Sequence, residues 1–395
     1  MQLCMNLMSL VRVWVVFHLY PTLLIQDTFH NIIRDKKWIN GSRIKGLTTK
    51  LLYDKWKTNM SQPMKLYSFM FRHLILMWSI LVFMMVQQAF FAQGNALPLI
   101  KEYQVPPGTH PHDVAPAENG SVWYTAQASG ELGLLDPFRN KTLHIVLGQG
   151  SAPHGVIVGP DGAPWITDGG LNGIVRVDPN TKNVTLFPLP KTTGYTNLNT
   201  ATFDKNGVLW FTGQSGFYGR LDPRTGTIEV FNAPRGQGPY GISTTPKGEV
   251  YFASLAGSYI AQINLETGNA TVLDPPTKEQ GARRIWPDSS GRVWFTEWNA
   301  GKLGMYNPVT DEWKEWKLPG QKPQPYAIFV DDKDIVWLSD FSSNAMVRFD
   351  PSLEKFQSFP LPSPEAKVRQ LLGRAGEILG AESGTDKIII IQTNN

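Results

Sequence analysis

Short apolar runs separated by glycine, asparagine and aspartate recur along this chain with a period of about 43 residues between Pro111 and Asp386. In each repeat the second run centres on a large apolar anchor. The anchors are Trp123, Trp165, Trp210, Tyr251, Trp294, Trp337 and Leu379. A two-residue turn signal such as Asp161-Gly162 precedes most anchors and allows the positive φ of a tight hairpin. The pattern predicts four short antiparallel strands per repeat.

Seven such repeats predict an all-β fold, a seven-bladed β-propeller whose blades are four-stranded antiparallel sheets. A blade buries its faces only against its neighbours, so the sheets must form a closed ring. The segment 101–105 resembles the fourth strands of other repeats, and we expect it to complete the blade that begins at Ala366. The anchors and glycine turns are then packing and turn residues rather than sites.

A hydrophobic N-terminal extension precedes the repeats. The apolar run 74–85 follows Lys65 and Arg72 and is followed by Ala89-Phe90-Phe91-Ala92, a partial small-x-small site, which together resemble a signal peptide. A membrane anchor is the alternative, because 5–25 is also apolar. We therefore divide the chain into three parts. They are an upstream extension over 1–63, a signal peptide or anchor over 64–95, and the propeller over 96–395. An over-called start codon would explain the upstream extension.

Charge and cysteine content limit the partners. Residues 1–92 hold 11 Lys and Arg against 3 Asp and Glu, whereas residues 93–395 hold 26 against 30. The basic pI therefore belongs to the extension, and the blades carry no basic run for nucleic acid. Cys4 is the only cysteine, so no disulfide can form in the ring. We expect a periplasmic or secreted monomer, membrane-associated only through its N-terminal segment, with a small-molecule ligand.

The first strand of each propeller blade lines the central channel, where ligands bind at one mouth. The residue eleven positions before each anchor begins that strand. This ring consists of His112, His154, Asn199, Tyr240, Arg283, Tyr326 and Val368. Three positions after the anchors lie Ala126, Asp168, Gly213, Ser254, Glu297, Asp340 and Glu382. Because the hairpin turn lies midway, we expect the two sets to face each other to within about a residue.

Three polar pairs follow from this register. They are Arg283 with Glu297, Tyr326 with Asp340, and His154 with Asp168. Each is either a contact that stabilises its blade or part of a site. A carboxylate beside His154 would fix the imidazole tautomer and raise its basicity. Arg283, between tyrosines of both flanking blades, suits an anionic or carbonyl oxygen. The predicted ligand-binding residues are Arg283, Tyr240, Tyr326, Asn199, Glu297 and Asp340.

Three phrases carry a family resemblance: Pro153-His154-Gly155, Pro239-Tyr240-Gly241-Ile242, and the run 293–298 followed by Lys302-Leu303-Gly304. Over roughly residues 100 to 390 the chain resembles the streptogramin B lyase (virginiamycin B lyase) family. The resemblance implies a seven-bladed propeller that opens a cyclic depsipeptide by elimination. In that reaction a His removes the proton α to the ester carbonyl, magnesium stabilises the enolate, and a C–O bond breaks without water.

The family's site residues are largely replaced. Aligned on the run 293–298, its first His falls on Arg283, its Glu-Pro-His on Gln324-Pro325-Tyr326, and its last acid on Asp340. Counting blades from the N-terminus puts Tyr326 and Val368 at the His positions instead. Arginine cannot hold magnesium, and tyrosine is a weak base near neutral pH.

A related set lies two blades round the ring. His112 is followed by Pro153-His154 and Asp168, with Ala152 where the Glu would stand. We therefore take His112, His154 and Asp168 as candidate catalytic residues and Mg²⁺ as the candidate cofactor, with its ligands unassigned. The chain otherwise has no zinc spacing, nucleophile elbow or phosphate loop.

These residues predict an exported lyase-like propeller that binds a small polar or anionic ligand at its channel, with carbon–oxygen lyase activity if it is an enzyme. Two alternatives stay open. One is a non-catalytic binding or scaffold propeller, since a fold does not fix a function. The other is a lactonase-like hydrolase.

Overall fold

The computed structural model describes residues 73–82 and 98–393. The chain separates into two compact units, Met1–Gly94 and Asn95–Asn395. In the first unit residues 73–82 form an exposed helix. Among the described residues, no helix combines the length and apolarity that crossing a membrane requires. Most of the predicted extension and signal segment lies outside the described residues.

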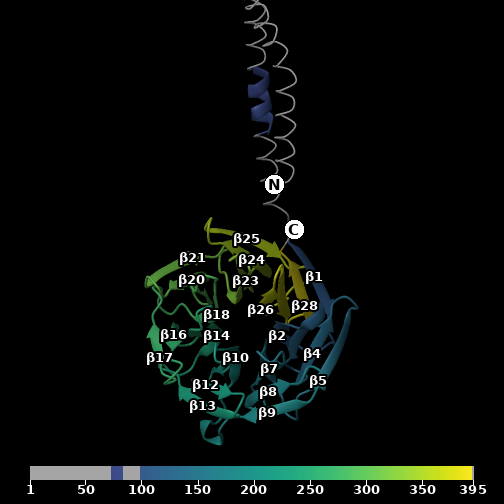
Figure 1. The fold of residues 1–395 in the computed structure, drawn as a ribbon, viewed down its shortest axis with the longest axis vertical. Coiled ribbons are helices and arrows are strands. Elements are labelled where there is room, and N and C mark those ends of the chain that lie inside the picture. The colour runs from purple at the N-terminus through teal and green to yellow at the C-terminus, as the bar shows by residue number, and fades with distance from the viewer. Residues whose placement is uncertain (1–72, 83–97, 394–395) are drawn as a thin grey trace, which may run out of the picture. The chain divides into compact units, whose positions relative to one another are not determined.

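The second unit is a ring of seven four-stranded antiparallel sheets, as the repeats predict (Figure 1). Blade one comprises β2 Pro111–Pro116, β3 Val122–Ala126, β4 Glu131–Asp136 and β5 Lys141–Val146. Blade two comprises β6 Pro153–Val158, β7 Pro164–Asp168, β8 Gly173–Val177 and β9 Val184–Pro188. Blade three comprises β10 Leu198–Phe203, β11 Leu209–Gly213, β12 Phe217–Asp222 and β13 Thr227–Asn232. Blade four comprises β14 Pro239–Thr244, β15 Val250–Ser254, β16 Tyr259–Ile263 and β17 Ala270–Leu273.

The later blades repeat this order. Blade five comprises β18 Ala282–Pro287, β19 Val293–Glu297, β20 Lys302–Asn307 and β21 Glu312–Lys317. Blade six comprises β22 Pro325–Val330, β23 Val336–Asp340, β24 Ala345–Asp350 and β25 Lys355–Pro360. Blade seven comprises β26 Val368–Arg374, β27 Glu377–Glu382, β28 Lys387–Gln392 and the N-terminal strand β1 Leu99–Gln104. Two short 3₁₀ turns, η1 Glu118–Gly120 and η2 Lys191–Thr193, lie in loops.

The closing strand is the one that the sequence predicts. β1 pairs with β28 along its whole length, from Leu99 opposite Gln392 to Gln104 opposite Lys387. Glu102 accepts hydrogen bonds from Lys387 Nζ at 2.6 Å and from the Ser363 backbone N–H at 2.8 Å. The first strand of the ring is therefore held both by the last blade and by the loop that leads into it.

The aromatic anchors are buried packing residues, as expected. Trp210 and Trp294 are almost fully buried. The indole N–H of Trp294 donates to Asp288 in the preceding turn at 2.8 Å, and Trp210 does the same to Asp204 at 2.9 Å. The turn residues thus satisfy the one polar atom of a side chain that fills the space between blades.

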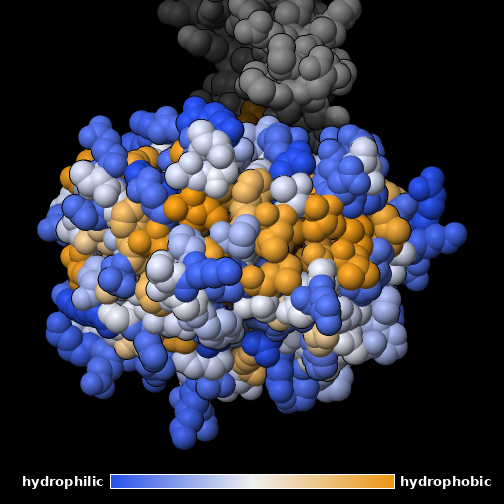
Figure 2. Space-filling model, turned by 90° about the horizontal axis from the view of Figure 1, so that it is seen from below, coloured by the Kyte–Doolittle hydropathy of each residue, from blue (hydrophilic) through white to orange (hydrophobic). Residues whose placement is uncertain are grey.

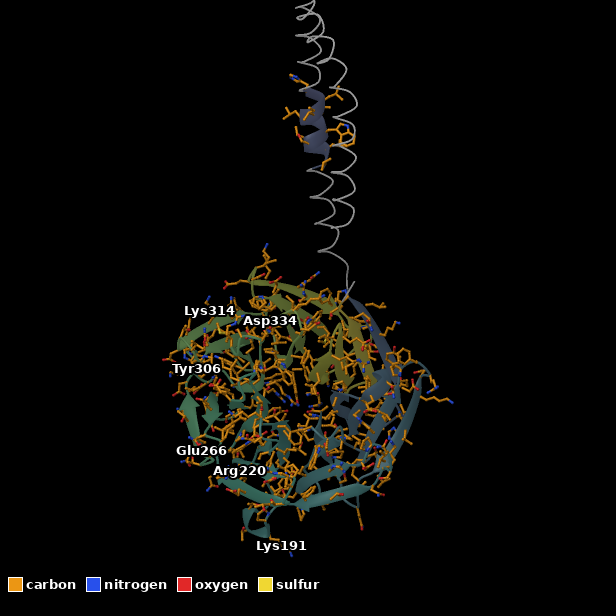
Figure 3. The ribbon with its side chains drawn as sticks, viewed as in Figure 1. Lys191, Arg220, Glu266, Tyr306, Lys314 and Asp334 are labelled. Atoms are coloured by element: carbon orange, nitrogen blue, oxygen red, sulfur yellow. The ribbon has the colours of Figure 1, made fainter. Side chains whose placement is uncertain are left out.

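Polar side chains dominate the rims of the ring (Figure 2). Lys191, Glu266 and Lys314 lie at its periphery (Figure 3). Seen edge-on, one side shows apolar surface between polar rims (Figure 2). Exposed apolar side chains of the outer strands include Leu143, Val146 and Leu186.

A side-chain hydroxyl two residues after most anchors joins neighbouring blades near the channel. In its own blade the hydroxyl oxygen accepts a hydrogen bond from the backbone N–H of the residue after the channel residue. The same hydroxyl donates a hydrogen bond to the backbone carbonyl of the channel residue in the next blade. The hydroxyls are Thr125, Thr167, Thr212, Thr296 and Ser339, and the carbonyls they reach belong to His154, Asn199, Tyr240, Tyr326 and Val368. In blades four and seven this position is Ala253 and Ala381.

The acidic residues at the ends of the second strands are structural. Asp168 accepts hydrogen bonds from Ser151 Oγ at 2.5 Å and from the Ala152 N–H at 2.9 Å, and so caps its own loop. Asp340 accepts from the Gln324 N–H at 2.7 Å in the equivalent loop. In contrast, neither carboxyl oxygen of Glu297 has a hydrogen-bond partner among the described residues, although both are buried.

We expect β1, rather than the residues before it, to stabilise the ring. A variant that begins at Gly94 should melt within a few degrees of the full chain, because it keeps all seven sheets intact. One that begins at Pro106 lacks β1 and exposes the edge of β28, so it should melt at least about 5 °C lower or fail to fold. Calorimetric melting of the two variants tests this. Equal melting temperatures for both would show that β1 is dispensable.

Glu297 should make the ring less stable as the pH rises. Burial, with a smaller contribution from the charge of Glu315, raises its pKa to about 8 from an ordinary value of 4.5. Between these values the unfolded chain loses the proton while the folded protein keeps it, so the free energy of unfolding falls with rising pH.

The neutral variant Glu297→Gln should remove this loss. We expect it to be more stable than the parent by about 4 kcal/mol at pH 8 and nearly equal to it at pH 4.5, measured by urea unfolding. The exposed Glu266 provides the matched control, and Glu266→Gln should follow the parent at both pH values. A Glu297→Gln variant that shows the parent's pH dependence would contradict the assignment.

Candidate functional site

Every first strand has a register shift at the channel, which leaves two consecutive residues unpaired in six blades and His154 alone in blade two. In blade seven these residues are Arg369 and Gln370, because Val368 still pairs with Glu382. In blade five the pairing with β19 jumps from Ala282 opposite Glu297 to Ile285 opposite Phe295. The predicted register is thus confirmed to within one residue. The irregularity turns consecutive residues, here Arg283 and Arg284, toward the channel instead of one inward and one outward.

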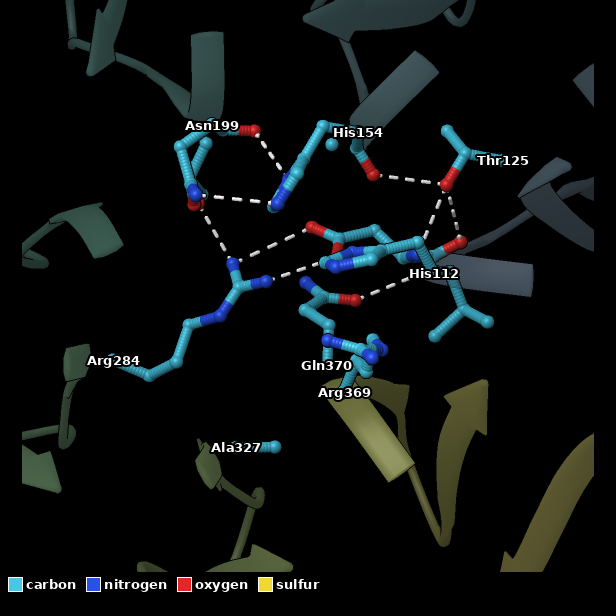
Figure 4. Close-up of polar contacts among 12 residues, drawn as sticks. His112, Thr125, His154, Asn199, Arg284, Ala327, Arg369 and Gln370 are labelled. Atoms are coloured by element: carbon cyan, nitrogen blue, oxygen red, sulfur yellow. Dashed lines mark hydrogen bonds and ion pairs between the residues drawn. The ribbon is translucent and has the colours of Figure 1, made fainter. Parts of the chain in front are cut away.

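A buried polar cluster joins blades one, two, three and five (Figure 4). Asp113 forms an ion pair with Arg284 at 2.9 Å, and its Oδ1 also lies 2.7 Å from His112 Nδ1. Arg284 donates a further hydrogen bond to Thr200 Oγ1 at 2.7 Å. The rings of His112 and His154 lie with their centroids 3.8 Å apart. The structure therefore brings the two candidate catalytic histidines together.

Asp168 does not join them, and the predicted pairing of His154 with Asp168 is wrong. His154 is oriented by Asn199 instead: its Nδ1 lies 3.0 Å from the Asn199 carbonyl oxygen, and its Nε2 lies 3.2 Å from the Asn199 amide nitrogen. The reason is that Asp168 caps its loop while the register shift turns His154 toward the channel.

A cage of aromatic rings surrounds Arg283. The guanidinium carbon lies 3.6 Å from the ring centroid of Tyr326, 4.5 Å from that of Trp298 and 4.7 Å from that of Tyr240. Arg283 also donates to Tyr240 Oη at 3.0 Å. Its Nε is buried without a hydrogen-bond partner. Cation–π attraction offsets part of the cost of partly burying the guanidinium, but it does not satisfy the Nε–H donor.

The predicted pairs of Arg283 with Glu297 and of Tyr326 with Asp340 are both wrong. Neither Glu297 carboxyl oxygen bonds to Arg283 or to any other described residue, and Asp340 caps a loop. Tyr326 Oη instead lies 2.5 Å from Tyr240 Oη, so the two phenols on blades four and six meet across blade five. Backbone register therefore predicts which strands are opposite but not where the long side chains point.

Arg369 is a second cation at the mouth, and the sequence analysis missed it. It follows Val368, donates from Nε to Ser383 Oγ at 2.7 Å, and lies 3.4 Å from Tyr326 Oη through a terminal nitrogen. The first hairpin of blade seven is one residue shorter than that of blade five, so Arg369 rather than Val368 has the place of Arg283. Asp113, Arg284 and Gln370 were not predicted because strict alternation points the residue after each channel position outward. A charged residue beside a channel position, as in His112-Asp113 and Arg283-Arg284, is the signal that could have found them.

The site carries an excess of positive charge. Burial lowers the pKa of both His112 and His154 well below the usual value, and the charge of Arg284 lowers both further. Both imidazoles are thus neutral near pH 7. Asp113 and Arg284 offset each other, whereas Arg283 and Arg369 form no ion pair with any carboxylate of the described residues. The positive charges of these two half-buried guanidiniums are therefore not offset by a carboxylate of the described residues.

Magnesium does not fit this donor set. Donor atoms of His112, Asp113 and His154 lie within 4.8 Å of one another. However, Mg²⁺ prefers oxygen ligands, and the single carboxylate here is already bonded to Arg284 and His112. The nearby guanidiniums further oppose a dication. At the position where the family places its last acid, Asp340 is occupied in capping a loop.

Comparisons with known proteins agree with this architecture. The model of the virginiamycin B lyase family matches residues 82–349. A solved streptogramin B lyase is 22% identical, covers 75% of this chain and 97% of its own, and has a TM-score of 0.69. Virginiamycin B lyase from Staphylococcus aureus, in selenomethionine form, is 21% identical, covers 75% and 99%, and has a TM-score of 0.70.

A more distant likeness is the extracellular domain of a hybrid two component system from B. thetaiotaomicron. It is 16% identical, covers 76% of this chain and 43% of that one, and has a TM-score of 0.60. No curated protein matches the chain. These solved structures show the fold, and the family model, which matches more than half of the sequence, shows the family. The chain belongs to the virginiamycin B lyase family.

Proposed function

We propose that this propeller binds a small carboxylate-bearing ligand at the channel mouth, between Arg283 and Arg369. The observation that supports it is the pair of guanidiniums without a carboxylate partner among the described residues, one of which has a buried and unused N–H. Partial burial of a cation without a counter-charge is unfavourable, and an anion from outside would offset that cost. A guanidinium also holds a carboxylate through two parallel hydrogen bonds.

The surroundings favour a carboxylate that carries an apolar or aromatic group. Trp298 and Phe341 are half-buried at the same mouth, with ring centroids 5.6 Å apart. Phe341 stacks on Tyr326 at 4.7 Å, and Trp298 lies over Arg283. Apolar surface beside an anion site is the usual composition of a small-molecule site. The ligand class we propose is therefore an aryl or alkyl carboxylate.

A carbon–oxygen lyase is the second candidate function, and family membership favours it. In this chain the base would be an imidazole of the buried cluster. His112 donates from Nδ1 to Asp113, which fixes the tautomer and leaves the Nε2 lone pair for a proton. The guanidiniums of Arg283 and Arg369 would stabilise the negative charge that forms on a carbonyl oxygen. Magnesium has no part in this proposal, because the donor set does not suit it.

Export as a monomer completes the proposal. The apolar run before the ring supports a signal peptide, and the ring closes on itself without a second copy. The likeness to an extracellular domain is consistent with this location. Sequencing the N-terminus of the mature protein tests the signal peptide, since cleavage should fall before Asn95.

The charge geometry of Arg283 should decide ligand affinity. Arg283→Lys keeps the positive charge but loses the planar fork, so we expect benzoate to bind about tenfold more weakly, measured by titration calorimetry. Arg139→Met, which removes an exposed arginine on the outside of blade one, should leave the affinity unchanged. Equal affinities for the parent and Arg283→Lys would contradict the proposed role of Arg283.

Lyase activity, where a streptogramin B is the substrate, should depend on the buried histidines and not on a metal. We expect ring opening, followed by mass spectrometry, to be lost in His112→Ala and His154→Ala and to persist in EDTA. Activity that survives both substitutions would exclude these residues. Benzoate binding without any turnover would favour the non-catalytic binding propeller, and hydrolysis of simple lactones would favour the hydrolase.

A further inference from the structure

We infer that the hydroxyl of Tyr326 and a bound anion compete to offset the same positive charge, so that the site takes up a proton when it binds an anion. This inference rests on the proposed anion site at Arg283 and Arg369. It goes further because it assigns Tyr326 a role as an internal counter-ion.

The geometry places Tyr326 at the centre of the uncompensated charge. Arg283 stacks on its ring at 3.6 Å, and Arg369 lies 3.4 Å from its hydroxyl oxygen. The hydroxyl of Tyr240 lies 2.5 Å away and can donate to a Tyr326 phenolate. Tyr240 itself receives a hydrogen bond from Arg283 at 3.0 Å, which favours its acting as the donor. Tyr326 is 1% exposed, so water cannot supply this stabilisation.

The charged and titratable groups around Tyr326 come from every neighbouring blade. On blade four this is Tyr240, on blade five Arg283 and Arg284, and on blade seven Arg369. Deeper in the channel lie His112, His154 and Asp113, with Asp113 paired to Arg284. The acids nearest in the strand order, Glu297 and Asp340, do not bond to Tyr326. Cations therefore dominate the surroundings of the hydroxyl.

The direction of titration agrees with this arrangement. Burial alone would raise the pKa of Tyr326, but Arg283, Arg284 and Arg369 outweigh it and lower the pKa below 10. Burial and the neighbouring Tyr326 raise the pKa of Tyr240 to about 12, so the proton of the pair is lost from Tyr326 first. A bound carboxylate would offset the guanidiniums and raise the Tyr326 pKa again.

The linkage therefore has a definite sign. Above the pKa of Tyr326 in the free protein, anion binding requires a proton from solvent, so affinity should fall up to tenfold per pH unit. Below that pKa the hydroxyl is already protonated, and affinity should not depend on pH. The site would release its anion as the surroundings become alkaline.

The first experiment needs no ligand. Titration of the full chain, followed by tyrosinate absorbance, should show one phenol ionising below pH 10 that is absent from Tyr326→Phe. Tyr195 is exposed and offers the control, since Tyr195→Phe should keep the early ionisation. Tyr240→Phe, which removes the donor to the phenolate, should move it to higher pH. An unchanged early ionisation in Tyr326→Phe overturns the inference whether or not any anion binds.

The second experiment uses benzoate, with uncharged benzamide as the comparison. Calorimetry in two buffers of different ionisation enthalpy should show proton uptake with benzoate and none with benzamide. Tyr326→Phe should bind benzoate with an affinity that no longer falls at alkaline pH. Benzoate binding without proton uptake at any pH overturns the inference about Tyr326 but still supports the proposed anion site at Arg283 and Arg369. Absence of benzoate binding contradicts the proposed function, and the absorbance titration then decides the role of Tyr326 alone.

Discussion

The hydroxyl that follows each anchor by two residues is the constraint on which the channel depends. One oxygen accepts an N–H from its own first strand and donates to a carbonyl of the next blade, as Thr167 does for Gly155 and Asn199. Because both partners are backbone groups beside the channel, this bond fixes where the neighbouring channel residue lies. It also satisfies an N–H that the register shift releases from the sheet.

Where the hydroxyl is missing, functional side chains take its place. Ala253 leaves the junction between blades four and five without the bond, and there Arg283 reaches Tyr240 instead. Ala381 likewise leaves the junction between blades seven and one without this hydrogen bond. There the side chain of Gln370 accepts a hydrogen bond from the backbone N–H of Val114 at 3.0 Å. The ring is thus two bonded arcs, blades one to four and five to seven. The ion pair of Arg284 with Asp113 joins the two arcs across the channel.

The repeat spacing predicts the blades and the channel positions, but it does not predict the contacts between their side chains. The anchors and turns have a fixed period, so the seven blades and the closing strand follow from spacing alone. The members of the channel ring, from His112 to Arg283, follow from the same period. The contacts between them do not, because the register shift redirects two consecutive residues and because Asp168 and Asp340 bond within their loops. Arg369 was not predicted because the first hairpin of blade seven is one residue shorter, so the fixed spacing from Leu379 falls on Val368 instead.

The N-terminal position of the closing strand determines when the ring can be completed. Gln104 donates to the carbonyl of Asp386, 282 residues further along the chain. Among the strands of the ring, β1 is synthesised first and its partner β28 last. The ring therefore cannot close until β28 has been synthesised, so its seventh sheet is the last to be completed. Contacts of such long sequence separation form slowly.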